Sequence, residues 1–190
     1  HLLPPHDPED LFPAEPRRQT WDYLHEVERR LAGSEPAIGA FRAALADGDA
    51  RLRERFLADE PVEELVRDRA RLVDRLLLRA WEMHSGPHGG ELALVALGGY
   101  GRGELLPCSD IDIMVLLPKT EAAPWTPDLE RFLTFLWDIG LEVGHSVRTI
   151  DDCQREAQSD VSVITTLIEA RLLAGQETLF TAMRRALGPD

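Results

Sequence analysis

The sequence predicts an α+β fold in which a small mixed sheet is flanked by helices and preceded by a helical extension. Helical spacing dominates the chain up to residue 88. Three short segments with the length of strands then follow, at Leu92–Leu97, Ile111–Leu117 and Glu142–Thr149. A helical pattern at Pro127–Ile139 lies between the last two of them. Helices therefore come first and then mix with strands, which indicates a helical extension followed by an α+β core.

Composition limits the class of protein and its partners. With 190 residues, 44% of them hydrophobic, the chain has enough apolar surface for one domain with a core. A formal net charge of −13 argues against nucleic acid as a partner. No apolar segment approaches the roughly 20 residues of a membrane span, so no membrane partner is expected. Cys108 and Cys153 have no ligand or redox spacing, which favours reduced thiols in a cytoplasmic protein.

The chain is expected to divide into three parts. Residues 1–18 contain prolines at positions 4, 5, 8, 13 and 16 and are predicted to form a flexible arm. Residues 19–88 form the helical N-terminal extension. Residues 89–190 contain the α+β core and the start of a following helical region.

The N-terminal extension carries several helical patterns. Spacing typical of a helix begins near Thr20, resumes after Pro36 and appears again, as a second pattern, around Leu52–Leu57. Pro61 suits the first turn of the longest helix, which should end before the glycine-rich loop at Ser85. Its apolar residues recur at spacings of three and four: Val62, Leu65, Val66, Leu72, Val73, Leu76, Leu77, Ala80 and Trp81.

Two helices are predicted in the C-terminal half. A cap and a first-turn proline at Thr126-Pro127 begin the first of them. The second, Val161–Ala174, starts with β-branched residues that a strand would also accommodate. Its length, the Asp160 cap before it and Gly175 after it favour a helix.

The glycine turn and the acid pair between the first two strands carry the chemistry. Side chains alternate along a strand, so Asp110 and Asp112 point the same way and repel each other unless a cation lies between them. Oxygen ligands suit Mg²⁺, which binds one or two carboxylates together with substrate phosphates. The glycines of the Gly98-Gly99 turn let a triphosphate approach the backbone closely. Each feature alone is common turn or strand-edge chemistry, but together they predict a metal-dependent nucleotidyl transfer site.

The residues around this site resemble a known family. Leu94–Leu105 and Ser109–Asp112 are similar to the nucleotidyltransferase motif of the polymerase-β-like superfamily. Within it they most resemble the bacterial protein-PII uridylyltransferases, bifunctional enzymes that add and remove uridylyl groups. Further matching segments are Arg71–Asp74, Phe135–Thr149 and Glu169–Gly175. The resemblance runs from about Phe41 to the C-terminus and implies a polymerase-β-like nucleotidyltransferase core.

The resemblance also implies roles for residues near the triphosphate. Gly98 and Gly99 would contact it through their backbone, and Ser109 would add a hydroxyl group. Arg102 would neutralise charge on the leaving diphosphate. A surface ion pair between Arg102 and Glu104 is an alternative of equal weight.

The acids would hold the metal, but the sequence departs from the superfamily at a third position. By resemblance, Asp110 and Asp112 bind Mg²⁺ or Mn²⁺ ions that bridge the α-phosphate and the attacking oxygen. Many members carry a third acid on the next strand, where the inward position here is Gly144. Glu142 lies on the same face and is a candidate substitute, although a residue directly after a helix is more often plain surface.

Four further polar residues accompany the motif. His145 is expected to face away from the acids as a hydrogen-bonded core residue. Arg148 is a candidate second phosphate contact. Glu169 and Arg171 either brace the site or pair with each other.

The implied reaction is the transfer of UMP from UTP to a tyrosine hydroxyl of a PII signalling protein, with release of diphosphate. A tyrosine starts with a pKa near 10 that a metal lowers, so a separate base is not required. UTP and PII are then the expected partners, and no uridylyl-removing activity is expected from these residues, which would be the N-terminal part of a larger enzyme. Two alternatives stay open: another superfamily member with a different substrate, and a nucleotide-binding regulatory domain that has lost turnover.

Overall fold

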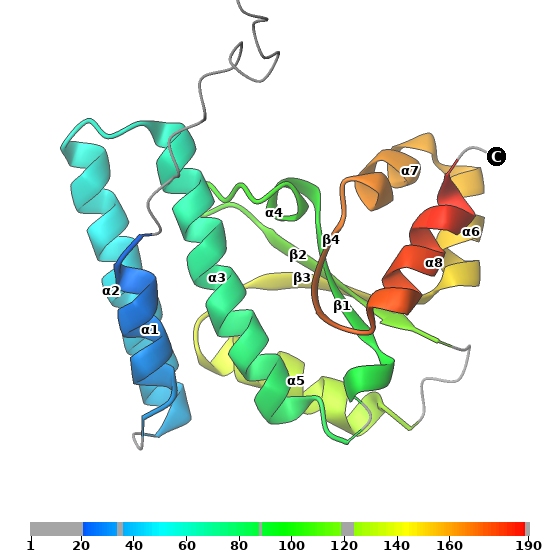
Figure 1. Ribbon diagram of the computed structural model, residues 1–190, viewed down its shortest axis with the longest axis horizontal. Coiled ribbons are helices and arrows are strands. Elements are labelled where there is room, and N and C mark those ends of the chain that lie inside the picture. Colours follow the sequence, from blue (N-terminus) through cyan, green and yellow to red (C-terminus); the bar gives the residue numbers. More distant parts are fainter. Residues whose placement is uncertain (1–20, 34–35, 88, 119–123, 189–190) are drawn as a thin grey trace, which may run out of the picture.

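The computed structural model describes residues 21–33, 36–87, 89–118 and 124–188, and every structural statement below concerns this part of the chain. The proline-rich arm predicted for residues 1–18 lies outside it. Figure 1 shows a central sheet with helices on both of its faces and a group of N-terminal helices at one side. This arrangement confirms the predicted α+β class.

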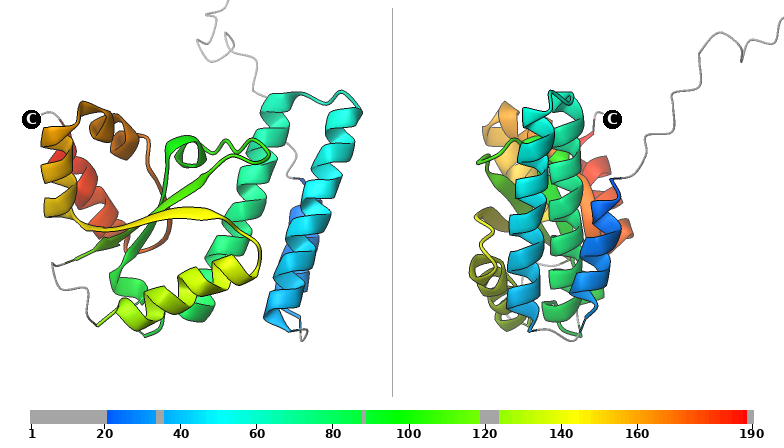
Figure 2. Two further views of the ribbon diagram at one scale, coloured as in Figure 1. Left: turned by 180° about the vertical axis from the view of Figure 1, so that it is seen from behind. Right: turned by 90° about the vertical axis from the view of Figure 1, so that its left-hand side faces the viewer.

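The N-terminal extension is helical, as predicted. Helices α1 (Tyr23–Leu31), α2 (Ala37–Leu57) and α3 (Val62–His84) lie side by side in both views of Figure 2. The separate helix expected around Leu52–Leu57 is instead the end of α2. Gly48 interrupts the apolar pattern because α2 packs closely on α3 there: a Cβ at this position would lie 2.5 Å from the Cδ2 atom of Leu72. Pro61, expected in the first turn of α3, precedes that helix as its N-cap residue.

The sheet contains the three predicted strands and a fourth. Its order is β3 (Val143–Thr149), β2 (Ile111–Leu117), β1 (Ala93–Leu97), β4 (Arg171–Gly175). Strand β1 is antiparallel to both of its neighbours, and β2 is parallel to β3. Helix α5 (Thr126–Asp138) connects the two parallel strands, because a parallel pair needs a crossover connection.

The helix predicted over Val161–Ala174 is wrong in its second half. Helix α7 ends at Ile168, and β4 follows and pairs with the open edge of β1. The conformation of this segment is therefore determined by its backbone hydrogen bonds to β1 and not by its local sequence pattern. Gly175, interpreted from sequence as a helix end, is the last residue of the strand. Its φ is +94°, and a Cβ there would lie 2.0 Å from the carbonyl oxygen of Leu92.

Two hydrophobic cores lie on the two faces of the sheet. One contains Leu94, Ile113 and Val115 and is covered by α3 and α5, with α1 and α2 outside. The other contains Val95 and Met114 and is covered by α6 (Ile150–Ser159), α7 (Val161–Ile168) and α8 (Glu177–Leu187). The Asp160 cap predicted from sequence is present, since its carboxylate accepts a hydrogen bond from the backbone N–H of Ser162 at 2.9 Å.

Three chain segments meet at one edge of the sheet. Strand β1 ends at this edge, while β2 and β3 begin there, because β1 runs against the other two. Leu97 pairs with Asp112, and Asp112 pairs with Gly144. A single helical turn, α4 (Gly98–Gly101), follows β1 directly. The short 3-10 helix Gly89–Glu91 precedes β1. The topology thus brings the glycine turn and the acid pair to the same edge.

Two further observations concern the expected environment. Cys108 is exposed and Cys153 is buried, and both are free thiols. In the part of the chain that the structure describes, none of the helices has the length and apolar character that crossing a membrane requires.

Replacing His84 by glutamine should weaken the dependence of the free energy of unfolding on pH in the acidic range. The ring packs on Phe135, with ring centroids 4.5 Å apart. Burial, followed by the positive charge of Arg131, lowers its pKa below the ordinary 6.5. Below about pH 6.5 the unfolded chain therefore binds more protons than the folded chain. As the pH is lowered, the free energy of unfolding falls until the pH is below the lowered pKa of His84 in the folded chain. Urea unfolding of His84→Gln between pH 7.5 and 5 measures this.

The exposed His25 supplies the matched control for that experiment. His25→Gln should keep the pH dependence of the parent. The same dependence of unfolding free energy on acidic pH in the parent and in His84→Gln would show that His84 does not cause it.

Candidate functional site

The glycine turn after β1 has a backbone that requires glycine at two positions. Gly98 has a φ of +60°, in the left-handed region that side chains disfavour. A Cβ at Gly101 would lie 2.8 Å from the carbonyl oxygen of Ala96 and 3.0 Å from that of Glu169. The turn therefore packs tightly on its own strand and on the segment before β4, and it brings the backbone of Gly98 and Gly99 to the edge where the acids lie.

The two predicted acids lie beside this turn. Asp110 and Asp112 are exposed, and within the described ranges no hydrogen bond or ion pair reaches either carboxylate. A Cβ built on Gly98 would be 3.6 Å from the Oδ2 atom of Asp112. A Cβ built on Gly144 would be only 2.6 Å from its Oδ1 atom. The carboxylate of Asp112 thus lies between two glycines, one in the turn that follows β1 and one on β3.

This donor set fits a divalent metal that arrives with its substrate. Among the described residues, no group of three or more His, Cys, Asp or Glu side chains is positioned to hold a metal ion. Mg²⁺ binds through one or two carboxylates and completes its shell with phosphate and water. Two unpartnered carboxylates beside a turn suited to phosphate therefore match Mg²⁺ or Mn²⁺ bound together with a triphosphate.

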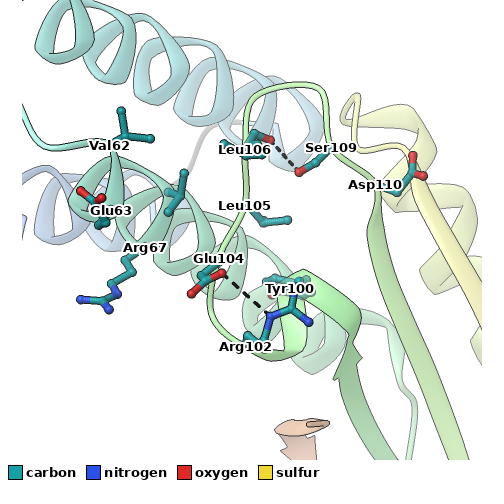
Figure 3. Close-up of a pocket in the computed structure, with 12 residues that line it drawn as sticks. Val62, Glu63, Arg67, Tyr100, Arg102, Glu104, Leu105, Leu106, Ser109 and Asp110 are labelled. Atoms are coloured by element: carbon teal, nitrogen blue, oxygen red, sulfur yellow. Dashed lines mark hydrogen bonds and ion pairs between the residues drawn. The ribbon is translucent and has the colours of Figure 1, made fainter. Parts of the chain in front are cut away.

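A pocket of about 380 Å³ extends from the turn toward α3 (Figure 3). Gly99, Arg102, Ser109 and Asp110, all predicted site residues, line it together with the N-terminal part of α3. The Ser109 hydroxyl donates a hydrogen bond to the carbonyl oxygen of Leu106 at 2.7 Å. Its proton is therefore used within the loop that carries Asp110, so toward the pocket the hydroxyl oxygen can act only as an acceptor.

Arg102 lies against the turn and makes ion pairs with two glutamates. Its Nη1 atom is 2.9 Å from Glu169 Oε2, and its Nε atom is 3.9 Å from Glu104 Oε2. Its Nη2 atom is 3.5 Å from a Cβ built on Gly99. Such exposed pairs contribute at most about 1 kcal/mol, so a phosphate group can replace them. The predicted pair with Glu104 is present at the longer distance, and the shorter pair is with Glu169, one of the two residues expected from sequence either to brace the site or to pair with each other.

A partly buried hydrogen-bond network lies behind the turn. The Tyr100 hydroxyl donates to Asp74 Oδ1 at 2.6 Å, and the Arg171 guanidinium reaches both Asp74 oxygens at 2.8 and 3.1 Å. Arg171 also donates to the backbone oxygen of Tyr100 at 3.0 Å. Burial, and next the Asp74 charge, raises the pKa of Tyr100 well above 10. The network ties α3, the turn and β4 together. Arg171 thus takes the bracing role that was one of its two expected roles, whereas its partners Asp74 and Tyr100 were indicated only by lying in segments that carry the family resemblance.

The remaining predicted residues take different places. Glu169 and Arg171 do not pair with each other, since they bond Arg102 and Asp74 respectively. Arg148 lies toward the other end of β3, where its Nε atom is 2.9 Å from Glu156 Oε2 on α6. His145 is exposed rather than a core residue, because β3 is the edge strand of the sheet. Glu142 is exposed, directly precedes β3 and lines a second pocket with both acids.

Replacing Tyr100 by phenylalanine should destabilise the fold. The substitution removes a hydrogen bond to the charged Asp74, and such bonds contribute about 1.5–3 kcal/mol. Tyr23→Phe is the matched control, because its buried hydroxyl donates to the neutral backbone oxygen of Ala44 at 2.7 Å, a bond of about 0.5–1.5 kcal/mol. Urea unfolding midpoints of both variants test the difference. A loss in Tyr100→Phe no larger than in Tyr23→Phe would show that the network adds nothing.

Comparisons with known proteins cover the segment that contains this site. The family described as nucleotidyltransferase domain matches residues 79–173, which include β1, the turn, both acids and β3. Proteins named bifunctional uridylyltransferase/uridylyl-removing enzyme are similar over most of the chain. The one from Pseudomonas fluorescens (strain SBW25) is 46% identical over 154 residues, covering 81% of this chain and 17% of the relative. The one from Stutzerimonas stutzeri (strain A1501) is 44% identical over 158 residues, covering 83% of this chain and 18% of the relative. The chain thus spans less than a fifth of the length of these relatives.

Proposed function

Because this chain belongs to the nucleotidyltransferase domain family, we propose that it transfers UMP from UTP to a tyrosine hydroxyl of a PII signalling protein and releases diphosphate. The names of its relatives support the uridylyl group as the group transferred, and UTP is the donor that the family resemblance implies. The acceptor follows from the family resemblance of the motif segments. We place the reaction in the cytoplasm, in keeping with two free cysteines.

The position of the Asp112 carboxylate is the observation that carries this proposal. It lies at the one place where the glycine turn and the third strand both approach β2, with Gly98 on one side and Gly144 on the other. Phosphates that contact the turn therefore lie next to the carboxylate that would hold their metal.

Each residue of the site has a separate role in the reaction. The backbone of Gly98 and Gly99 receives the diphosphate part of UTP, and Arg102 exchanges its glutamate partners for phosphate charge. Asp110 and Asp112 hold Mg²⁺ or Mn²⁺, and Ser109 keeps the loop before β2 in place. When bound, the metal neutralises charge on the phosphates and lowers the pKa of the attacking hydroxyl.

The acceptor hydroxyl can be deprotonated without a general base from this chain. At the third acidic position of the superfamily this chain has Gly144, which makes room for Asp112 instead of adding a base. Glu142 is the nearest acid along that strand and is exposed in the same pocket. A tyrosine whose pKa the metal lowers loses its proton to water without a dedicated base.

Mass spectrometry of the acceptor tests the proposal. The chain is incubated with PII, Mg²⁺ or Mn²⁺ and each of UTP, ATP, CTP and GTP, while isothermal titration measures the binding of each nucleotide. We expect weak UTP binding with a modest preference over the others, and slow addition of UMP to a PII tyrosine. A strong ATP preference with adenylylation would assign a different nucleotidyltransferase. No triphosphate binding with either metal would indicate a regulatory domain without turnover.

A further inference from the structure

A second pocket opens on the opposite side of the acid pair from the glycine turn. It has a volume of about 550 Å³ and is lined by the acids of β2, the C-terminal half of α5 and the start of β3. We propose that this pocket is the docking site for a tyrosine-bearing, positively charged loop of the acceptor protein, and that Trp137 is its main contact. The inference rests on the proposed function and adds to it the surface that receives the acceptor.

The direction of the reaction assigns this side to the acceptor. In phosphoryl transfer the attacking and leaving oxygens lie roughly in line on opposite sides of the phosphorus. Under the proposed function the leaving diphosphate lies at Gly98 and Gly99, on the β1 side of Asp112. The attacking hydroxyl must then approach from the β3 side, where Gly144 faces the same carboxylate. The second pocket lies on that side and reaches both acids.

Trp137 gives this pocket an exposed aromatic wall. Its side chain is 73% exposed, whereas Phe132, Phe135 and Leu136 on the same helix are buried in the core. Leu133 and Leu141 continue the apolar surface within the pocket. Tryptophan is enriched among the residues that dominate protein interfaces, and it offers a flat face on which a tyrosine ring stacks. An exposed indole beside reactive carboxylates is therefore suited to hold the ring whose hydroxyl reacts.

The charge of the pocket indicates the sign of the charge on the loop that binds there. Three acidic side chains line it, Asp110, Asp112 and Glu142, together with one histidine, His145, and no lysine or arginine. Once a metal neutralises the first two, Glu142 remains as an uncompensated charge at the entrance. A basic side chain next to the acceptor tyrosine would pair with Glu142 or lie on the face of Trp137 as a cation–π partner.

Steady-state kinetics with PII as the varied substrate test the docking surface. Trp137→Ala should raise the KM for PII by about tenfold or more, the effect of losing a dominant interface residue. The kcat and the dissociation constant for UTP with Mg²⁺ should change less than about twofold, and Trp137→Phe should recover most of the loss because it keeps an aromatic ring. Phe56→Ala on α2 is the matched control, since Phe56 is 58% exposed and lines neither pocket beside the acids. It should leave the KM for PII unchanged.

Iodide quenching of fluorescence gives a readout without turnover. Trp81 and Trp125 are buried and Trp21 is half-buried, so Trp137 is the indole that iodide reaches most readily. A PII variant with phenylalanine at the acceptor position should protect it, and UTP with Mg²⁺ alone should not. Protection by UTP alone, or a raised UTP dissociation constant in Trp137→Ala, would mean that the indole stacks on the nucleobase and would overturn the proposal.

The two proposals fail in different ways. If the unsubstituted chain transfers no UMP to PII with either metal, the proposed function fails and the docking surface fails with it. If transfer occurs and Trp137→Ala keeps the parental KM for PII, the proposed function stands and the docking surface alone is wrong.

Discussion

Asp112→Asn should abolish UMP transfer without harming the fold. The side chain is exposed, pairs within the sheet only through its backbone and lies between Gly98 and Gly144, so an amide of the same shape fits there. The amide carries no charge and holds a divalent metal poorly. A loss of about 4 kcal/mol of transition-state stabilisation corresponds to at least about a thousandfold in rate. Without metal, the variant should melt at or slightly above the parental temperature, because repulsion with Asp110 is relieved.

Initial rates of PII modification, thermal melts and titration of Mn²⁺ with UTP measure these three effects together. Asp151→Asn is the matched control, since it removes the same charge from an exposed position on α6. It should leave the transfer rate and the binding of Mn²⁺ with UTP unchanged and lower the melting temperature only slightly, because Asp151 lies in the first turn of α6, where a carboxylate is favourable. Normal transfer by Asp112→Asn would end the assignment of the metal site, and a large drop in melting temperature would show that Asp112 has a structural role.

The strands that were predicted well are those whose own pattern determines them. Ile111–Leu117 was located to the residue, because it is apolar at every position except Asp112 and follows a loop that contains Pro107 and Ser109. The strands predicted at Leu92–Leu97 and Glu142–Thr149 each differ from the observed ones by one residue. Strands β1 and β2 are central and almost wholly buried, so burial and local preference favour the same conformation there, whereas β3 is the edge strand and was located by its residue pattern alone.

Features that depend on distant partners were missed. Strand β4 exists because β1 offers an open edge, and nothing within Arg171–Gly175 distinguishes it from the end of a helix. The bond between Tyr100 and Asp74 joins residues 26 positions apart, and that between Arg171 and Asp74 joins residues 97 apart. Such pairs become visible only when the fold is known.

The candidate site shows the same division. The types and spacing of Gly98, Gly99, Asp110 and Asp112 predicted a shared edge, and the topology places them there. The sequence also identified Gly144 as the position without an acid, but not its consequence, which is the space that it leaves for the Asp112 carboxylate. Trp137 had no distinguishing signal, because an aromatic residue in an amphipathic helix is usually buried.

Gly144→Ala should separate activity from stability at this site. Glycine in a strand costs roughly 0.5–1 kcal/mol relative to alanine, so the substitution should leave the melting temperature unchanged or raise it. Its new Cβ would lie 2.6 Å from Asp112 Oδ1, closer than a real contact allows, and the carboxylate would have to turn away. A displacement of about 1 Å in a reacting group is enough to cost about a hundredfold in kcat/KM. Metal-dependent UTP binding should weaken in parallel.

Gly90→Ala is the matched control, because a Cβ at that position meets nothing within 4 Å. Kinetics, UTP titration with Mg²⁺ and thermal melts of both variants distinguish the possible causes of a loss. Lower activity with an unchanged or higher melting temperature in Gly144→Ala alone would locate the reaction at the Asp112 carboxylate. Lower activity together with a lower melting temperature would mean that β3 itself is disturbed. Full activity would mean that the carboxylate works from another position than the one between Gly98 and Gly144, and the arrangement on which the proposed function depends would have to be abandoned.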